Sequence, residues 1–166
     1  MRSLKTFLLL ALVALWLGGC ALHPFSSITP GMARDEVLSR MGKPTATVAL
    51  PQGQGTRLQY SGQPGGQYAF MVDIDAAGKV SRARQVLTAE EFARINSGQW
   101  TREDVVREFG PPAFIERVAS WQGDILTYRW YGFQDMFYWV YLDSSQRVQK
   151  SHAGVEERIS IMPDAL

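Results

Sequence analysis

The feature that most constrains the fold of this chain is an internal repeat. Ile28 and Gly31 return as Ile95 and Gly98, and after a one-residue insertion the pattern continues at an offset of 68 positions. The pairs matched at this offset are Val37 and Val105, Gly42 and Gly110, Pro44 and Pro112, Leu58 and Leu126, Tyr60 and Tyr128, Val72 and Val140, Asp75 and Asp143, and Val80 and Val148. This register predicts two homologous modules, at residues 28–87 and 88–158, followed by a C-terminal tail at 159–166. Two coincidental helix-then-hairpin segments are the alternative.

Each module is expected to begin with two short helices. In the second copy, Thr88 opens a Thr-x-x-Glu capping box, and Thr101 can cap a second helix with Asp104 three residues further on. Gly110 then supplies a left-handed stop, and the prolines after it prevent continuation. In the first copy Ala33 replaces the capping threonine, so that helix start should be weaker by about 1 kcal/mol.

Strands are expected after the helices. Segments 68–74 and 137–142 are rich in aromatic and branched residues, and a turn-forming sequence follows each of them. The predicted fold class is therefore α+β, with two tandem repeats, each having two helices packed on one face of a small antiparallel sheet of three or so strands.

Alternation along these strands predicts a buried and an open face. The residues assigned to the core are Phe70, Val72, Ile74, Tyr138, Val140 and Leu142. The opposite face of the second copy carries Arg129, Tyr131, Phe137, Trp139 and Tyr141. Because aromatic residues and arginine dominate binding hot spots, we predict that this face binds a protein partner. Alternatively, the modules bury this face against each other or under the tail, and the arginine pairs with an acidic neighbour.

The N-terminus has the three parts of an export signal. Arg2 and Lys5 precede an apolar run, 7–17, which is too short to span a bilayer as a helix. The sequence Leu17-Gly18-Gly19-Cys20 resembles the lipobox of bacterial lipoproteins. We therefore expect a signal peptide at 1–19, a lipidated tether at 20–27, and diacylglycerol and an N-acyl chain (typically palmitate) on the cysteine. An ordinary secreted protein is the alternative.

Two further features of this region bear on compartment and thiol chemistry. By resemblance to enterobacterial lipoproteins, Ala21 implies transport to the periplasmic face of the outer membrane. Cys20 is also the chain's one cysteine, so no disulfide framework is possible.

The remaining sequence indicates no chemistry of its own. Without Arg2 and Lys5, 15 basic residues face 16 acidic ones, so no global field recruits nucleic acid. His23 and His152 have no companions at metal-ligand spacing, and the Gly65-Gly66 loop lacks the helix and lysine of a phosphate loop. We therefore expect no enzyme activity, no catalytic residue, no metal and no cofactor besides the lipid.

Both copies resemble the SmpA/OmlA (BamE-like) family of outer-membrane lipoproteins. The matching residues are Ile28, Gly31-Met32-Ala33, Asp35-Glu36-Val37 and Gly42-Lys43-Pro44, then Ile95, Gly98, Thr101, Glu103-Asp104-Val105 and Gly110-Pro111-Pro112. The resemblance implies an accessory factor in envelope or outer-membrane protein assembly, with the assembly machinery as a partner. The tandem layout is more like the β-lactamase inhibitory protein fold, which implies as an alternative a periplasmic inhibitor or ligand-binding module.

Overall fold

The computed structural model describes residues 24–156. The expected signal peptide, Cys20 and the tail at 159–166 lie outside the described residues.

Strands are the main regular structure of the described chain and form two four-stranded antiparallel sheets. In both sheets the spatial order of the strands follows the sequence. The first sheet consists of β1 (Ala46–Ala49), β2 (Thr56–Ser61), β3 (Ala69–Ile74) and β4 (Val80–Gln85). The second consists of β5 (Phe114–Glu116), β6 (Ile125–Tyr131), β7 (Asp135–Leu142) and β8 (Val148–Val155). The helical segments are η1 (Pro24–Ser27), α2 (Arg34–Met41), η2 (Pro51–Gly53), α3 (Ala89–Phe92) and α4 (Arg102–Phe109).

The expected fold class, two helices packed on a small sheet in each repeat, is wrong. The chain is mostly β, and its helices are too short to cover a sheet in pairs. The first helix of each repeat shrinks to the 3-10 turn η1 or to the four residues of α3. After α3, Gly98 adopts φ 79° and donates its N–H to the Val148 carbonyl at 2.6 Å, which joins the chain to the edge of the second sheet.

The local helix signals are confirmed. Thr101 and Asp104 form a complete capping box at the start of α4, whereas Ala33 provides no side-chain cap for α2. Both helices end at a glycine with positive φ, Gly42 at 76° and Gly110 at 80°.

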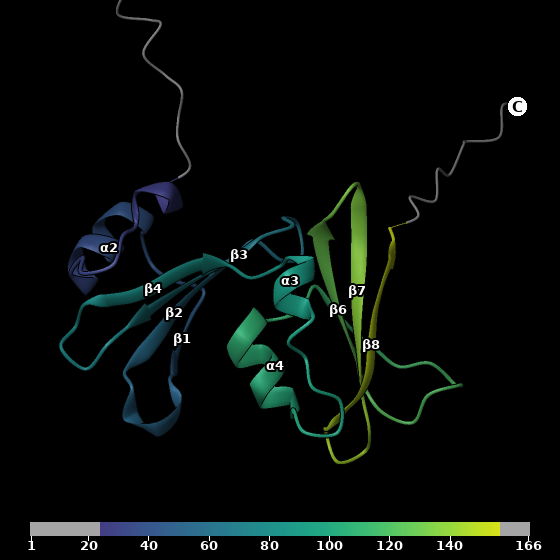
Figure 1. The fold of residues 1–166 in the computed structure, drawn as a ribbon. Helices are drawn as coiled ribbons and strands as arrows, with labels where there is room; N and C mark the ends of the chain where they lie inside the picture. The colour runs from purple at the N-terminus through teal and green to yellow at the C-terminus, as the bar shows by residue number, and fades with distance from the viewer. Residues whose placement is uncertain (1–23, 157–166) are drawn as a thin grey trace, which may run out of the picture.

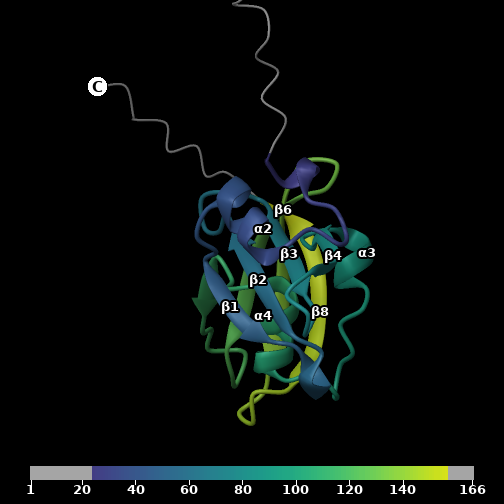
Figure 2. The ribbon, with the colours of Figure 1, turned by 90° about the vertical axis from the view of Figure 1, so that its left-hand side faces the viewer.

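The elements stack in alternating layers (Figure 1). Helix α2 covers one face of the first sheet, and α3 and α4 lie between the two sheets. No helix in the described part of the chain covers the far face of the second sheet. Figure 2 shows the same stack of layers from the opposite side, where α2 lies.

The two halves match in detail at the offset of 68 positions. The Tyr60 hydroxyl donates to the Gly42 carbonyl at 3.2 Å, and the Tyr128 hydroxyl donates to the Gly110 carbonyl at 2.9 Å. The pairing of β3 with β4 shifts register between residues 73 and 74, and the pairing of β7 with β8 shifts register between residues 141 and 142. The same tertiary contacts therefore recur in both halves.

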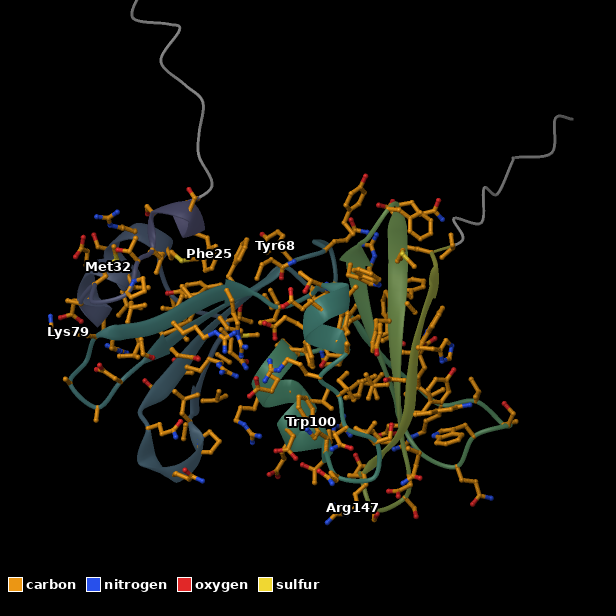
Figure 3. All side chains as sticks on the ribbon, viewed as in Figure 1. Phe25, Met32, Tyr68, Lys79, Trp100 and Arg147 are labelled. Carbon is orange, nitrogen blue, oxygen red and sulfur yellow. The ribbon has the colours of Figure 1, made fainter. Side chains whose placement is uncertain are left out.

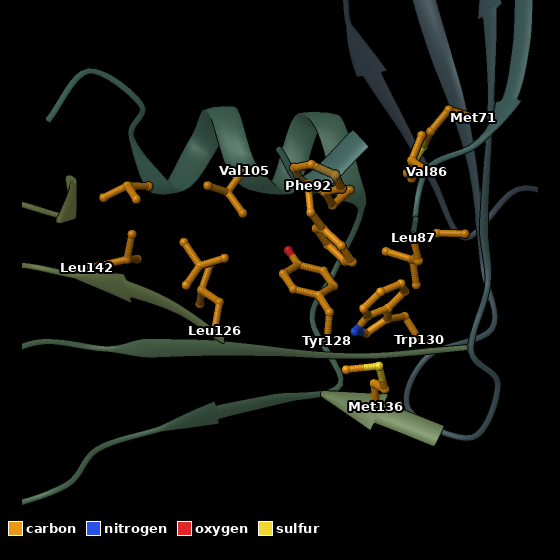
Figure 4. Packing of buried hydrophobic residues seen from close by; sticks show 14 residues of the cluster. Met71, Val86, Leu87, Phe92, Val105, Leu126, Tyr128, Trp130, Met136 and Leu142 are labelled. Atoms are coloured by element: carbon orange, nitrogen blue, oxygen red, sulfur yellow. The ribbon is translucent and has the colours of Figure 1, made fainter. Parts of the chain in front are cut away.

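One core joins the two repeats (Figure 4). Phe92 of α3 stacks on Tyr138 at 3.9 Å and on Phe109 of α4 at 5.0 Å, above the inner face of the second sheet. Met71 and Leu87 of the first repeat enter the same cluster. The remaining face of the first sheet packs under α2 around the buried Val37, Leu58, Tyr60, Val72, Ile74 and Val80.

Candidate binding face

The first sheet shows how the chain covers a sheet face. Its side toward α4 carries buried polar residues that bond to that helix. The Gln59 side-chain amide donates to the Val106 carbonyl at 2.9 Å. Arg57 binds Asp73 through two hydrogen bonds of 2.5 and 3.0 Å, and Glu108 of α4 at 2.9 Å.

Ion pairs continue across this junction. Arg84 of β4 binds Glu108 at 2.9 Å and Glu91 of α3 at 3.2 Å. Burial alone would raise the pKa of the Glu108 carboxyl, but Arg57 and Arg84 outweigh it and hold that pKa below its ordinary value. Burial lowers the pKa of the Arg84 guanidinium, which its acidic partners only partly offset. The two repeats are thus joined by a buried charge network.

A charged cleft of about 510 Å³ opens beside this network. Its charged lining residues are Arg57, Asp73, Asp75, Arg82, Arg84, Arg94 and Glu108. Within residues 24–156, no group of three or more His, Cys, Asp or Glu side chains is placed to hold a metal ion. No helix in this range is long and apolar enough to cross a bilayer.

The equivalent face of the second sheet replaces this polar network with aromatic rings. At the offset of 68, Met71 corresponds to Trp139, Asp73 to Tyr141, and Arg84 to His152. Ala69, buried in the first repeat, corresponds to the half-buried Phe137. The face that forms ion pairs with a helix in the first repeat therefore carries aromatic rings in the second repeat.

These rings form a continuous row, which we call the aromatic band. It consists of Phe114, Trp121, Phe137, Trp139, Tyr141 and His152. Neighbouring ring centroids are separated by 5.2 to 6.3 Å, within the range of favourable aromatic pairing. The Lys150 ammonium lies 4.4 Å from the centre of the Tyr141 ring and 5.1 Å from that of Trp121.

Strand pairing assembles the band. Trp139 lies directly opposite His152, and Tyr141 opposite Lys150, because β7 and β8 pair in that register. The Trp139 ring also lies over Gly154, where an added Cβ would stand 2.6 Å from it. At one end, Trp121 donates its indole N–H to the Leu142 carbonyl at 2.8 Å, which fixes the loop after β5 against the sheet.

The two other predicted binding residues come from β6, where Arg129 lies directly opposite Phe137 and Tyr131 ends the strand. Arg129 pairs with Glu156 at 2.8 Å and donates to the Pro64 carbonyl at 2.9 Å, so it holds the β2–β3 loop in place. Tyr131 is 65% exposed at the end of β6. Arg129 is therefore paired with an acidic neighbour, Glu156, which is the alternative stated for it in the sequence analysis.

Sequence reasoning missed four members of the band region. Lys150 and His152 come from β8, and Phe114 and Trp121 come from β5 and the loop after it. The positions of Lys150 and His152 could have been predicted from the tight turn at Asp143, because that turn sets the register in which β8 pairs with β7. No local signal indicates where the loop carrying Trp121 packs.

No protein-family model matches the chain, and a search of curated proteins finds no match. Among solved structures, a DUF4309 family protein (YjgB) from Bacillus subtilis subsp. subtilis str. 168 is similar to this chain with a TM-score of 0.31 and 14% identity. The likeness covers 75% of this chain and 78% of that one, and it is too weak to support an argument. The resemblance to the SmpA/OmlA family stays a prediction.

Proposed function

We propose that this chain is a non-enzymatic lipoprotein, anchored to the periplasmic face of the outer membrane, that binds protein partners as an accessory factor in envelope or outer-membrane protein assembly. The observation that carries the binding role is the aromatic band on a sheet face that no helix within residues 24–156 covers. Rings such as Trp139 and Tyr141 bury much area at little cost in side-chain entropy, and they dominate measured hot spots. The lipobox and the family resemblance support the location and the assembly role.

The first repeat adds support to the binding role. There the equivalent sheet face is buried under α4, with Met71 in the shared core and Gln59 bonded to the helix backbone. Because the second repeat has the same sheet topology, its equivalent face is geometrically suited to another element packing on it. The bulkier side chains at Trp139 and Tyr141 favour an apolar partner surface over the ion-paired one used within the chain.

Photocrosslinking in cells tests this proposal directly. A photoreactive amino acid replaces His152, which is exposed on the band side of β8, or in the matched control Ala153, which is exposed on the opposite side of the same strand. We expect outer-membrane assembly subunits to be captured from position 152 and not from position 153. Capture of a soluble hydrolase without those subunits would contradict the proposal and favour the periplasmic inhibitor of the β-lactamase inhibitory protein type.

The anchor is tested separately through Cys20. A Cys20→Ala variant, exported by a signal peptide that is cleaved without lipidation, should move from the membrane fraction to the soluble periplasm, because a folded domain with a nearly neutral surface has little membrane affinity of its own. Unchanged membrane association would refute lipid attachment at this cysteine.

A further inference from the structure

Three segments from distant parts of the sequence meet at one end of the molecule. The described chain begins there at Pro24, and both the loop between β2 and β3 and the turn between β6 and β7 lie at the same end in two perpendicular views (Figures 1 and 2). Gln63 and Arg129 exchange two hydrogen bonds of 2.7 and 3.0 Å, which join the β2–β3 loop to the end of β6. Gln67 bonds to Asp135 of β7 at 3.2 Å.

This end carries exposed aromatic side chains, which we call the rim: Tyr68, Tyr131 and Phe133. Phe133 is 77% exposed, Tyr131 is 65% exposed and Tyr68 is 41% exposed. Tyr68 is visible at this end beside Phe25, which follows the first described residue (Figure 3). Single exposed apolar residues are ordinary, but three on neighbouring segments need an explanation.

The turns at the opposite end of the sheets have a different composition. Asp75 and Asp143 cap those turns by accepting backbone N–H groups at 2.8 to 2.9 Å, and neither turn carries an aromatic residue. Tight turns generally favour small polar residues and glycine, so a phenylalanine at position 133 is not explained by turn geometry. The β6–β7 turn therefore differs from these two turns in carrying an exposed aromatic residue.

The short stretch of chain between Cys20 and Pro24 indicates that the surrounding of this end is the lipid bilayer. Four residue steps separate Cys20 from Pro24, a reach of at most roughly 14 Å in an extended chain. A lipid on Cys20 therefore brings the rim end to the bilayer surface. Beside the rim, Arg129 forms an ion pair with Glu156 at 2.8 Å, and the Asp135 carboxylate accepts a hydrogen bond from the Gln67 amide at 3.2 Å. The paired arginine at this end therefore offers little attraction for an anionic ligand.

We propose that the rim inserts into the interfacial region of the bilayer and fixes the orientation of the molecule on the membrane. Tyrosine favours this region because its apolar ring and its hydroxyl are both accommodated there, and phenylalanine supplies apolar area that is buried at the acyl boundary. The lipid supplies the affinity, and the rim supplies the second contact that turns a flexible tether into a defined pose. The inference rests on the lipid anchor of the proposed function.

The test uses the single cysteine, so it does not depend on lipidation in the cell. The mature chain, starting at Cys20, is coupled through that thiol to a maleimide-bearing phospholipid in neutral phosphatidylcholine vesicles that contain a diazirine-labelled phosphatidylcholine. After irradiation, mass spectrometry locates the labelled peptides. We expect label in the β6–β7 turn and near Tyr68, and little at Ile115, which is 53% exposed but lies beside the start of β6.

Two variants complete the test. Phe133→Ser should reduce label in the turn by roughly threefold or more, because the main inserted ring is lost. Ile115→Ser is the matched control and should leave that label unchanged. Equal labelling of both ends, or no effect of Phe133→Ser, would overturn the proposal, as would a crosslinker at position 133 that captures a protein instead of lipid in cells. Absence of acyl mass on native Cys20 would instead refute the anchor of the proposed function.

Discussion

At the scale of single residues, Gly55 and Gly123 hold equivalent places at the entry to the two sheets. Their φ angles are 119° and 152°, and an added Cβ would lie 2.0 Å from the Ile74 carbonyl oxygen or 1.9 Å from that of Leu142. Only glycine allows this approach of one strand to the next.

Alanine at Gly123 should therefore be strongly destabilising. We expect Gly123→Ala to lower the free energy of unfolding by at least about 2 kcal/mol, since it adds a backbone clash to a strained φ. Gly65→Ala is the control, because its Cβ would meet no heavy atom within 4 Å, and it should stay within about 0.5 kcal/mol of wild type. Urea unfolding measures both, and equal values for the two variants would contradict this reading.

At the scale of elements, helices α2 and α4 are equivalent but differently capped. We expect Thr101→Ala to destabilise the protein by about 1 kcal/mol. The Thr101 hydroxyl would no longer accept a hydrogen bond from the Asp104 N–H or donate one to the Asp104 carboxylate. Ala33→Thr should stabilise it by up to about 1 kcal/mol, because Ala33 already has extended φ and ψ and Glu36 stands at the third helical position. Thermal unfolding measures both, and no change in either variant would count against the cap assignment.

The local parts of the elements could be predicted from sequence. The cap at Thr101 and the stop at Gly110 depend on neighbours within a few residues, so composition is enough to find them. The fourth strand of each sheet was missed because β1 and β5 are only four and three residues long and are stabilised by pairing with β2 and β6. Pairing between distant segments leaves little local signal.

The candidate site divides in the same way. Alternation along β7 placed Phe137, Trp139 and Tyr141 on one face, as the structure has them. Whether a helix covers that face depends on tertiary packing, and so does the contribution of His152 from β8. For that reason the sequence left open whether the modules bury this face against each other or under the tail.

At the scale of the whole molecule, the junction between repeats should depend on pH. The pKa of Glu108 is held below its ordinary value, so its ion pairs stabilise the fold fully above the pKa of an unfolded glutamate, near 4.5. This stability is lost as pH falls through the lower folded value.

A change of side chain at Glu108 tests the charge network. We expect Glu108→Gln to lower the free energy of unfolding at neutral pH by about 3 kcal/mol, since Arg57 and Arg84 lose a buried partner, and to flatten the acid-side slope. Glu103→Gln, an exposed position on the same helix, should keep the wild-type profile. Urea unfolding between neutral and acidic pH measures both variants, and an unchanged slope in Glu108→Gln would refute the assigned role.

The aromatic band is proposed to bind a protein partner. The most direct measurement compares capture of the partner found by crosslinking, in detergent extract, by wild type, by Trp139→Ser/Tyr141→Ser, and by Phe133→Ser as a surface-aromatic control. We expect the double variant to keep a native near-ultraviolet spectrum and to bind at least about thirtyfold more weakly, while the control binds normally. Undiminished capture by the double variant, or loss of its native spectrum, would contradict the claim.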